Sequence, residues 1–337
     1  MKRILFAIFI ITLLFSGVYS EENNDFYDNT RTYKLQIPEV RVEGEVTNPG
    51  VVDFSKLNRH SAIVREAFLD GEGSLSFNGA YRYDGYSLFD ILKERYVSKK
   101  NREEFSPVID LLVVVENGDG DRAVFSWGEI FYPDNLHRIL IATGVSPIIP
   151  TKSGEQWPIP ESGKLVCAVD MISERNISNP SKITVMTQPL SFEVDRDLDP
   201  LYSKKVKVHM QGNTVNEITS LEDYGRTREY PAVFYGRGRG FHGVRHFRGK
   251  LLKNVLKKAL NVTRDNIRKG YFCVSAADGY RITMTFSEIF NRNDHADFLM
   301  TDQGEGTDGG RFLLYPAPDF FSDRAVKAIT GIHFMKI

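Results

Sequence analysis

The sequence predicts a β-rich α+β protein built from two similar halves. Two long segments carry the prediction, Leu111–Phe131 and Tyr271–Phe290, in which an apolar strand pattern, an Asp-Gly pair and a second strand pattern follow one another. An Asp-Gly pair between alternating apolar runs is a strong β-hairpin signal. Both segments end in Glu-Ile-Phe, at the same distance from the turn. The expected turn residues are Asp119, Gly120, Asp278, Gly279 and Tyr280.

The similarity extends upstream of both hairpins. Phe77–Glu94 and Phe241–Lys258 have two glycines at the same spacing, each followed by apolar residues at helical intervals. Ser87 fits the N-cap of the first of these helices. We therefore expect two homologous domains, a first half at 34–190 and a second half at 205–337, joined by an acidic linker at 191–204. A chain of 337 residues is long enough for two domains.

The N-terminus has the features of a signal peptide at residues 1–20. Lys2 and Arg3 precede an apolar run, Ile4–Phe15, and small residues follow it. The run is shorter than the about 20 residues that span a bilayer, although an uncleaved anchor is the alternative. We expect a periplasmic or secreted protein with a flexible leader at 21–33 and no membrane span after cleavage.

Composition and motifs exclude several classes of function. A net charge of −1 gives no overall attraction to nucleic acid or an anionic membrane. The chain has no Cys-x-x-Cys, no His-Glu-x-x-His and no Gly-x-Ser-x-Gly, so we expect no metal site and no serine nucleophile. Cys167 and Cys273 lie in apolar strand patterns, which favours buried free thiols; a disulfide or a metal-bound thiolate are the alternatives.

One segment has an unusual local charge. No acidic residue occurs at Tyr230–Thr263, and within it arginines alternate with glycines, histidines and aromatic residues. Glycines let backbone N–H groups approach an anion, and arginine binds carboxylate or phosphate bidentately. The alternative is a solvated basic loop that balances the acidic linker. The candidate anion-binding residues are Arg237, Arg239, His242, Arg245, His246 and Arg248.

Several short motifs together resemble a known family. The pattern Val-x-Gly-x-Val-x-Asn-Pro-Gly at Val42–Gly50, the glycine-flanked helix pattern and the Asp278-Gly279-Tyr280 turn resemble the molybdopterin-binding oxidoreductase domain of the sulfite oxidase superfamily. The resemblance implies an α+β domain with a β-rich core, here in tandem degenerate copies. It also implies molybdenum on a pterin, held by a cysteine thiolate in a loop ahead of the helix.

Two features favour a copy of this fold without its metal centre. Cys167 and Cys273 lie in predicted core strands and not in the loop that holds the family's ligand cysteine. The N-terminal sequence also lacks the twin arginine used to export folded holoenzymes. We therefore expect a non-catalytic protein without a cofactor that binds an anionic small molecule or an envelope protein, and no nucleic acid. The alternatives are an active periplasmic molybdopterin-dependent oxidoreductase and an envelope protein that binds polyanions through Arg237–Lys258.

Overall fold

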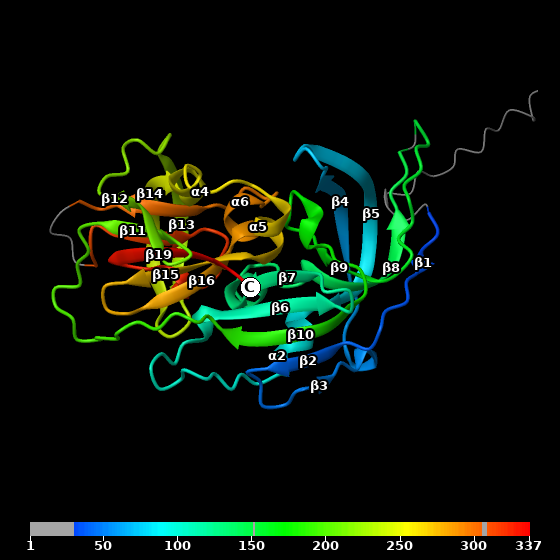
Figure 1. Ribbon diagram of the computed structural model, residues 1–337, viewed down its shortest axis with the longest axis horizontal. Coiled ribbons are helices and arrows are strands. Elements are labelled where there is room, and N and C mark those ends of the chain that lie inside the picture. The colour runs from blue at the N-terminus through cyan, green and yellow to red at the C-terminus, as the bar shows by residue number, and fades with distance from the viewer. Residues whose placement is uncertain (1–29, 151, 305–308) are drawn as a thin grey trace, which may run out of the picture.

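A computed structural model describes residues 30–150, 152–304 and 309–337 (Figure 1). The predicted signal peptide and most of the predicted leader lie outside the described residues. The end of the leader is described, and Tyr33–Lys34 form strand β1, paired with β8 (Ile139–Pro147). No helix in the described ranges is long and apolar enough to cross a membrane.

The first half forms two sheets. One has the order β1-β8-β5-β4, with β9 also paired to β8, and the other has the order β3-β2-β10-β6-β7. All pairs are antiparallel except β2 with β10, which is parallel. The remaining strands are β2 (Arg41–Gly44), β3 (Gly50–Val51), β4 (His60–Leu69), β5 (Leu75–Ser87), β6 (Leu111–Asn117), β7 (Arg122–Ser126), β9 (Lys164–Cys167) and β10 (Pro180–Thr187). The helices are η1 (Phe54–Lys56), α2 (Leu88–Lys93), η2 (Val108–Asp110), α3 (Trp127–Phe131) and η3 (Ser173–Arg175).

The second half forms the other two sheets, with the orders β12-β11-β19-β15-β16 and β13-β14-β17-β18. Only β11 with β19 is parallel among their pairs. The strands are β11 (Val206–Met210), β12 (Asn213–Ile218), β13 (Arg228–Gly236), β14 (Gly240–Leu251), β15 (Gly270–Ala276), β16 (Arg281–Thr285), β17 (Phe298–Asp302), β18 (Phe312–Pro316) and β19 (Ile329–Lys336). The helices are α4 (Leu252–Leu256), α5 (Arg264–Lys269), α6 (Phe286–Phe290) and η4 (Ser322–Arg324).

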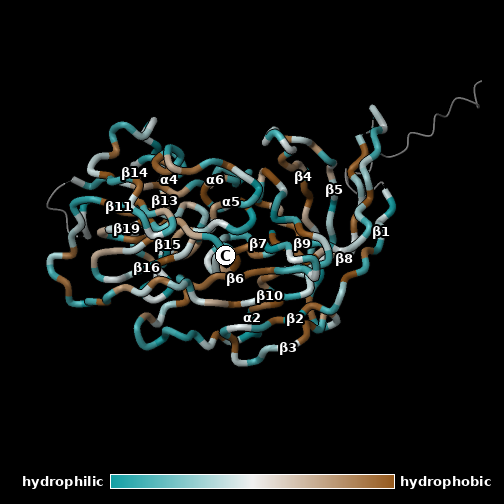
Figure 2. Tube along the Cα trace, in the orientation of Figure 1, coloured by the Kyte–Doolittle hydropathy of each residue, from teal (hydrophilic) through white to brown (hydrophobic). Residues whose placement is uncertain are grey.

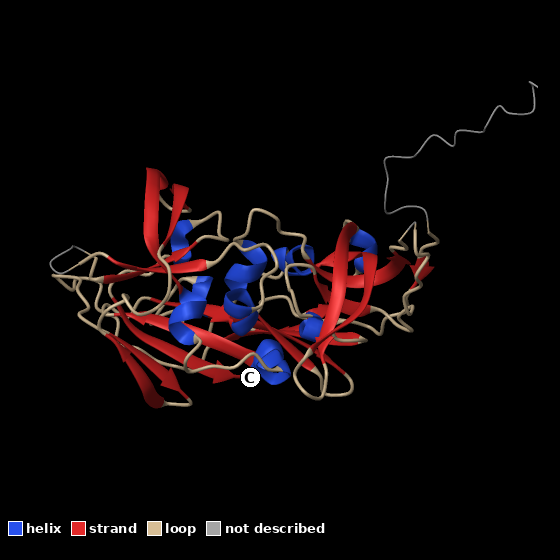
Figure 3. Ribbon diagram, turned by 90° about the horizontal axis from the view of Figure 1, so that it is seen from above, coloured by secondary structure: helices blue, strands red, loops and turns tan. Residues whose placement is uncertain are grey.

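The predicted fold class is wrong. The four sheets make a four-bladed β-propeller with about 13% helix, which is unlike two sulfite oxidase-like α+β domains. The helical patterns that follow the two equally spaced glycine pairs form only the short helices α2 and α4, of six and five residues. Apolar residues at helical spacing over one or two turns therefore predicted short helices but not a layer of helices. The short helices lie between the sheets (Figure 3). Because the chain does not have the sulfite oxidase-like fold, the resemblance to molybdopterin-binding domains is not supported.

One hydrophobic cluster spans the two halves, whose strand orders correspond. The predicted hairpins are confirmed as β6–β7 and β15–β16, and hydrophobic residues colour much of β6 and β7 in Figure 2. One hydrophobic cluster contains Phe105, Ile109 and Tyr132 of the first half together with Phe272 and Met284 of the second. Removing either half would therefore expose part of this cluster to water, at a cost that scales with the apolar area.

Two buried ionic triads lie where the halves meet. In each, one guanidinium contacts two carboxylates at 2.5–2.7 Å, and all six side chains are at most 2% exposed. Buried charges are tolerated only when they are paired and hydrogen-bonded. The first triad is Arg175, Glu129 and Asp170, and the second is Arg324, Glu288 and Asp319.

Hydrogen bonds link the triads reciprocally across the two halves. Ser126 Oγ, at the N-cap of α3, donates to Glu288 Oε2 at 2.6 Å. Thr285 Oγ1, at the N-cap of α6, donates to Glu129 Oε2 at 3.1 Å. Each cap therefore orders its own helix and also satisfies the carboxylate of the other half. The two halves are fixed to one another by this polar centre as well as by the shared apolar cluster.

Candidate functional site

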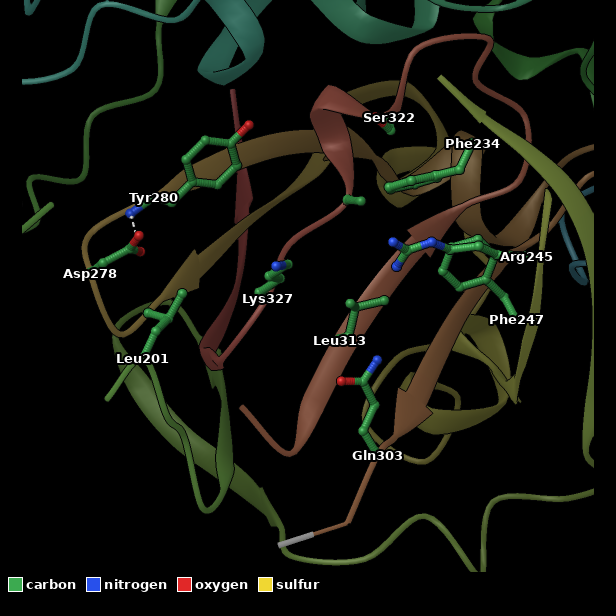
Figure 4. Close-up of a pocket in the computed structure, with 11 residues that line it drawn as sticks. Leu201, Phe234, Arg245, Phe247, Asp278, Tyr280, Gln303, Leu313, Ser322 and Lys327 are labelled. Atoms are coloured by element: carbon green, nitrogen blue, oxygen red, sulfur yellow. Dashed lines mark hydrogen bonds between the residues drawn. The ribbon is translucent and has the colours of Figure 1, made fainter. Parts of the chain in front are cut away.

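A cavity of about 540 Å³ opens beside the sheet β13-β14-β17-β18 of the second half (Figure 4). Its walls come from β13, β14 and β18, from the β15–β16 turn, and from η4 and the segment that follows it. Leu201, from the predicted linker, also lines it. Segments far apart in the sequence thus meet at one opening, as is usual for ligand sites.

The floor of the cavity is aromatic and aliphatic. Phe247 of β14 is 8% exposed and stacks on Tyr315, with ring centroids 3.9 Å apart and planes at 7°. Phe234 of β13 lies 5.3 Å from Phe247, centroid to centroid. Leu313 of β18 completes this surface. The rings are held by their neighbours, so the apolar floor is formed before any ligand arrives.

Two cations face this floor. Arg245 lies two residues before Phe247 on β14, so the alternation of a strand places both side chains on the same face. Its guanidinium carbon is 5.5 Å from the centroid of the Phe234 ring. Lys327 enters from the opposite wall (Figure 4). Over the described ranges, neither cation forms an ion pair within 4.0 Å.

Two further polar side chains of the wall are already engaged. Asp278, the only carboxylate among the described lining residues, accepts a hydrogen bond from the Tyr280 backbone N–H at 3.0 Å. The Tyr280 hydroxyl donates to the backbone oxygen of Asp323 at 2.5 Å. Burial, and secondarily the charge of Asp323, raises the pKa of Tyr280, so this phenol stays neutral at neutral pH. Among the described lining residues, two cations therefore stand against one carboxylate.

The structure brings one of the six predicted anion-binding residues into this cavity, Arg245. The basic segment is not a converging loop but the hairpin β13–β14, whose side chains alternate between two faces. Arg237 is engaged elsewhere, since its backbone N–H donates to Asp323 Oδ2 at 3.2 Å. His246 lies 2.9 Å from Glu229 Oε1.

The other three predicted residues lie around the hairpin. Arg239 is in the turn between β13 and β14, and Arg248 follows Phe247 and so faces away from the cavity. The ring of His242 is 5.8 Å from that of Phe234, at the edge of the same surface. The predicted turn residues Asp278 and Tyr280 do line the cavity, a role that the hairpin prediction did not include.

Sequence reasoning missed Lys327, Leu201 and Gln303, all of which line the cavity. They come from three separate segments, and no local pattern marks any of them. Among the described residues, the lining contains no histidine and no cysteine. Cys167 and Cys273 are buried free thiols, as predicted, and burial raises the pKa of both.

No protein-family model matches the chain, and no curated protein matches it. The function must therefore be argued from the geometry and charge of the cavity.

Proposed function

We propose that this protein binds a small amphipathic anion, with an aromatic or aliphatic body and a carboxylate, sulfonate or phosphate head. The observation that carries the proposal is the pair Arg245 and Lys327, two cations that have no carboxylate partner among the described residues, above the aromatic floor of Phe234 and Phe247. The role is non-catalytic, and the cavity's lining supplies contacts and charge only.

The size and chemistry of the cavity fit such a ligand. Ligand pockets commonly measure about 300–1,000 Å³ with mainly apolar walls and a few polar groups, and this one has about 540 Å³. Burial of the ligand's body contributes roughly 25 cal/mol per Å² of apolar area. A guanidinium fork on the head group adds charge-assisted hydrogen bonds, which are about twice as strong as neutral ones.

The experiment is a titration with 8-anilinonaphthalene-1-sulfonate, a fluorescent amphipathic anion. Arg245→Met should weaken its binding about 10- to 100-fold, because a hydrogen bond to a charged group contributes about 1.5–3 kcal/mol. Lys327→Met should weaken it in the same direction. Arg248→Met is the matched control on the opposite face of β14 and should bind as the wild type does. Equal affinities for the Arg245 and Arg248 variants would contradict the proposal.

The exposed part of the β13–β14 hairpin favours a second candidate, docking of an acidic partner protein. Val233, Phe241 and Val244 are 67%, 63% and 64% exposed, and Arg239 lies at the same tip. Exposed apolar side chains beside unpaired cations are typical of interaction surfaces. Replacing Phe241 and Val244 by serine should abolish such docking but leave sulfonate binding intact. Loss of sulfonate binding in that variant would refute the separation of the two sites.

We also propose that the protein acts outside the cytoplasm. The proposal rests on the charged start and short apolar run within residues 1–20. A fusion of residues 1–20 to a reporter that is active only after export tests it. Activity should be lost when Lys2 and Arg3 are kept but the apolar run is interrupted by two aspartates. An active reporter in that variant would contradict it.

A further inference from the structure

Three side chains of the first half meet at a place that the proposed binding function does not use. His60 begins β4, Asp90 is the third residue of α2, and His137 lies two residues before β8. One nitrogen of each ring and one oxygen of the carboxylate lie within 4.8 Å of one another. None of the three lines the cavity of the second half.

The carboxylate of this group is held in place from two sides. Ser87 Oγ, the N-cap of α2, donates to Asp90 Oδ2 at 3.0 Å and lies 3.0 Å from His137 Nδ1. Lys93 Nζ donates to Asp90 Oδ1 at 2.9 Å. Asp90 Oδ2 therefore faces the two rings, 2.6 Å from His60 Nε2 and 3.6 Å from His137 Nδ1. The hydrogen bond from Ser87 is an outer contact of the kind that fixes the orientation of a carboxylate ligand.

The fold does not require these residues. The second half has the same order of elements, and there the corresponding positions carry different side chains. His60 pairs with a glycine near the end of β5, and its counterpart is the residue that pairs with the glycine near the end of β14. The counterpart of Asp90 is the third residue of α4. The counterpart of His137 is the residue two positions before β17. These residues are Arg228, Asn254 and Ala296. A group that one half has and the other folds without calls for a role other than stability.

We propose that His60, Asp90 and His137 bind a divalent transition-metal ion of the zinc class, with a fourth position open to water. Two imidazoles and a carboxylate are a typical ligand set for zinc, whereas calcium and magnesium prefer oxygen ligands alone. The side chains of His60, His137 and Asp90 are 22%, 36% and 4% exposed. The ion therefore reaches the site from solvent while its carboxylate ligand is shielded.

The distances between the ligand atoms are close to those of a coordinated site, although the two rings must reorient. Ligand atoms about 2.0–2.1 Å from a tetrahedral zinc ion lie about 3.3 Å from one another, and the two distances to Asp90 Oδ2 fall on either side of that value. The rings of His60 and His137 are stacked, with centroids 3.7 Å apart and planes at 7°. They must turn out of this stack so that both nitrogens point at the ion.

The test is calorimetric titration of the tag-free full chain with Zn²⁺, together with the visible absorption spectrum of bound Co²⁺. The wild type should bind one equivalent, and Co²⁺ should give the bands of a tetrahedral or five-coordinate site. His137→Ala and Asp90→Asn should each weaken binding at least about 100-fold, more than loss of an outer-shell contact typically does. An unchanged affinity in both variants, or a wild type that binds no Zn²⁺, overturns the proposal.

The second half offers a matched control. His209 and His333 are also stacked, at 4.5 Å and 3°, but form no three-residue ligand group in the described part of the chain. The double variant His209→Ala, His333→Ala should bind Zn²⁺ as the wild type does. If it alone loses binding, the site is in the wrong half and the proposal fails.

Lys93→Met keeps the test informative even if the ligand variants fold poorly. The Lys93 ammonium is paired with Asp90 Oδ1 at 2.9 Å, and its positive charge competes with and repels a metal ion bound to the same carboxylate. Its removal should tighten Zn²⁺ binding several-fold. Weaker binding in a folded Lys93→Met protein would contradict the assignment of Asp90 as the ligand.

Discussion

Replacing Glu129 with glutamine removes one of the four carboxylates that share two buried guanidinium groups where the halves meet. Arg175 and Arg324 supply two positive charges against these four carboxylates. Burial raises the pKa of Glu129 to about 7, against the opposing charge of Arg175, and raises that of Asp319 to about 6. One carboxyl in each half therefore takes up a proton more readily in the folded than in the unfolded chain.

The sign and size of the effect follow from linkage. Because the pKa of Glu129 rises from 4.5 to about 7 on folding, the folded protein binds this proton more tightly. The resulting contribution to stability is complete below about pH 4.5 and is lost as the pH rises through about 7. Each unit of pKa corresponds to about 1.4 kcal/mol, so the contribution is about 3 kcal/mol. Glutamine cannot take up the proton at any pH.

The free energy of unfolding of the wild type and of Glu129→Gln should be measured by urea denaturation between pH 4.5 and 8. The difference, wild type minus variant, should fall by about 3 kcal/mol across this range. Glu39→Gln is the control, because Glu39 is exposed and forms a surface ion pair of 3.4 Å with Arg41. A difference for Glu129→Gln that stays flat or grows with pH would show that Arg175 keeps Glu129 ionised, and would refute the reasoning.

Three further outcomes are expected. Ser126→Ala removes the hydroxyl that caps α3 and contacts the other half, and should lower the free energy of unfolding by about 1–2 kcal/mol. A loss under about 0.5 kcal/mol in urea denaturation would contradict this expectation. Phe247→Ala deletes a buried ring of the cavity floor and should cost about 3 kcal/mol by the same assay, with an unchanged midpoint as the contrary result. Cys167 and Cys273 should resist a disulfide reagent at neutral pH until the protein unfolds, since both thiols are buried with raised pKa; rapid labelling of the native protein would oppose this.

The turns of the fold could be predicted from the sequence because their signal is local. Gly120 and Gly279 adopt φ values of +89° and +79°, which glycine reaches without strain. An Asp-Gly pair between two apolar runs therefore identifies both hairpins without knowledge of the rest of the chain. The arrangement of the sheets has no such signal. In each half an early strand pairs in parallel with the last strand, β2 with β10 and β11 with β19, and only the tertiary structure reveals this closure.

The two sites were predictable to different degrees for the same reason. Arg245 was identified because it lies in a segment whose composition is unusual. Lys327 lies in a segment of ordinary composition, and only the fold brings it to the same cavity. The residues His60, Asp90 and His137 are far apart in the sequence and match no spacing motif for metal ligands. The sequence therefore predicted no metal site, and the grouping became visible only where β4, α2 and β8 meet.

The central claim is that the cavity selects a negative charge on an apolar body, and one comparison tests it most directly. The wild type should be titrated with 8-anilinonaphthalene-1-sulfonate and with N-phenyl-1-naphthylamine, which has the same aromatic body without the sulfonate. Arg245 and Lys327, which have no ion-pair partner in the described part of the chain, predict that the sulfonate binds at least about 10-fold more tightly, and that added salt reduces this preference. Equal binding of the two probes, or tighter binding of the neutral one, would contradict the account.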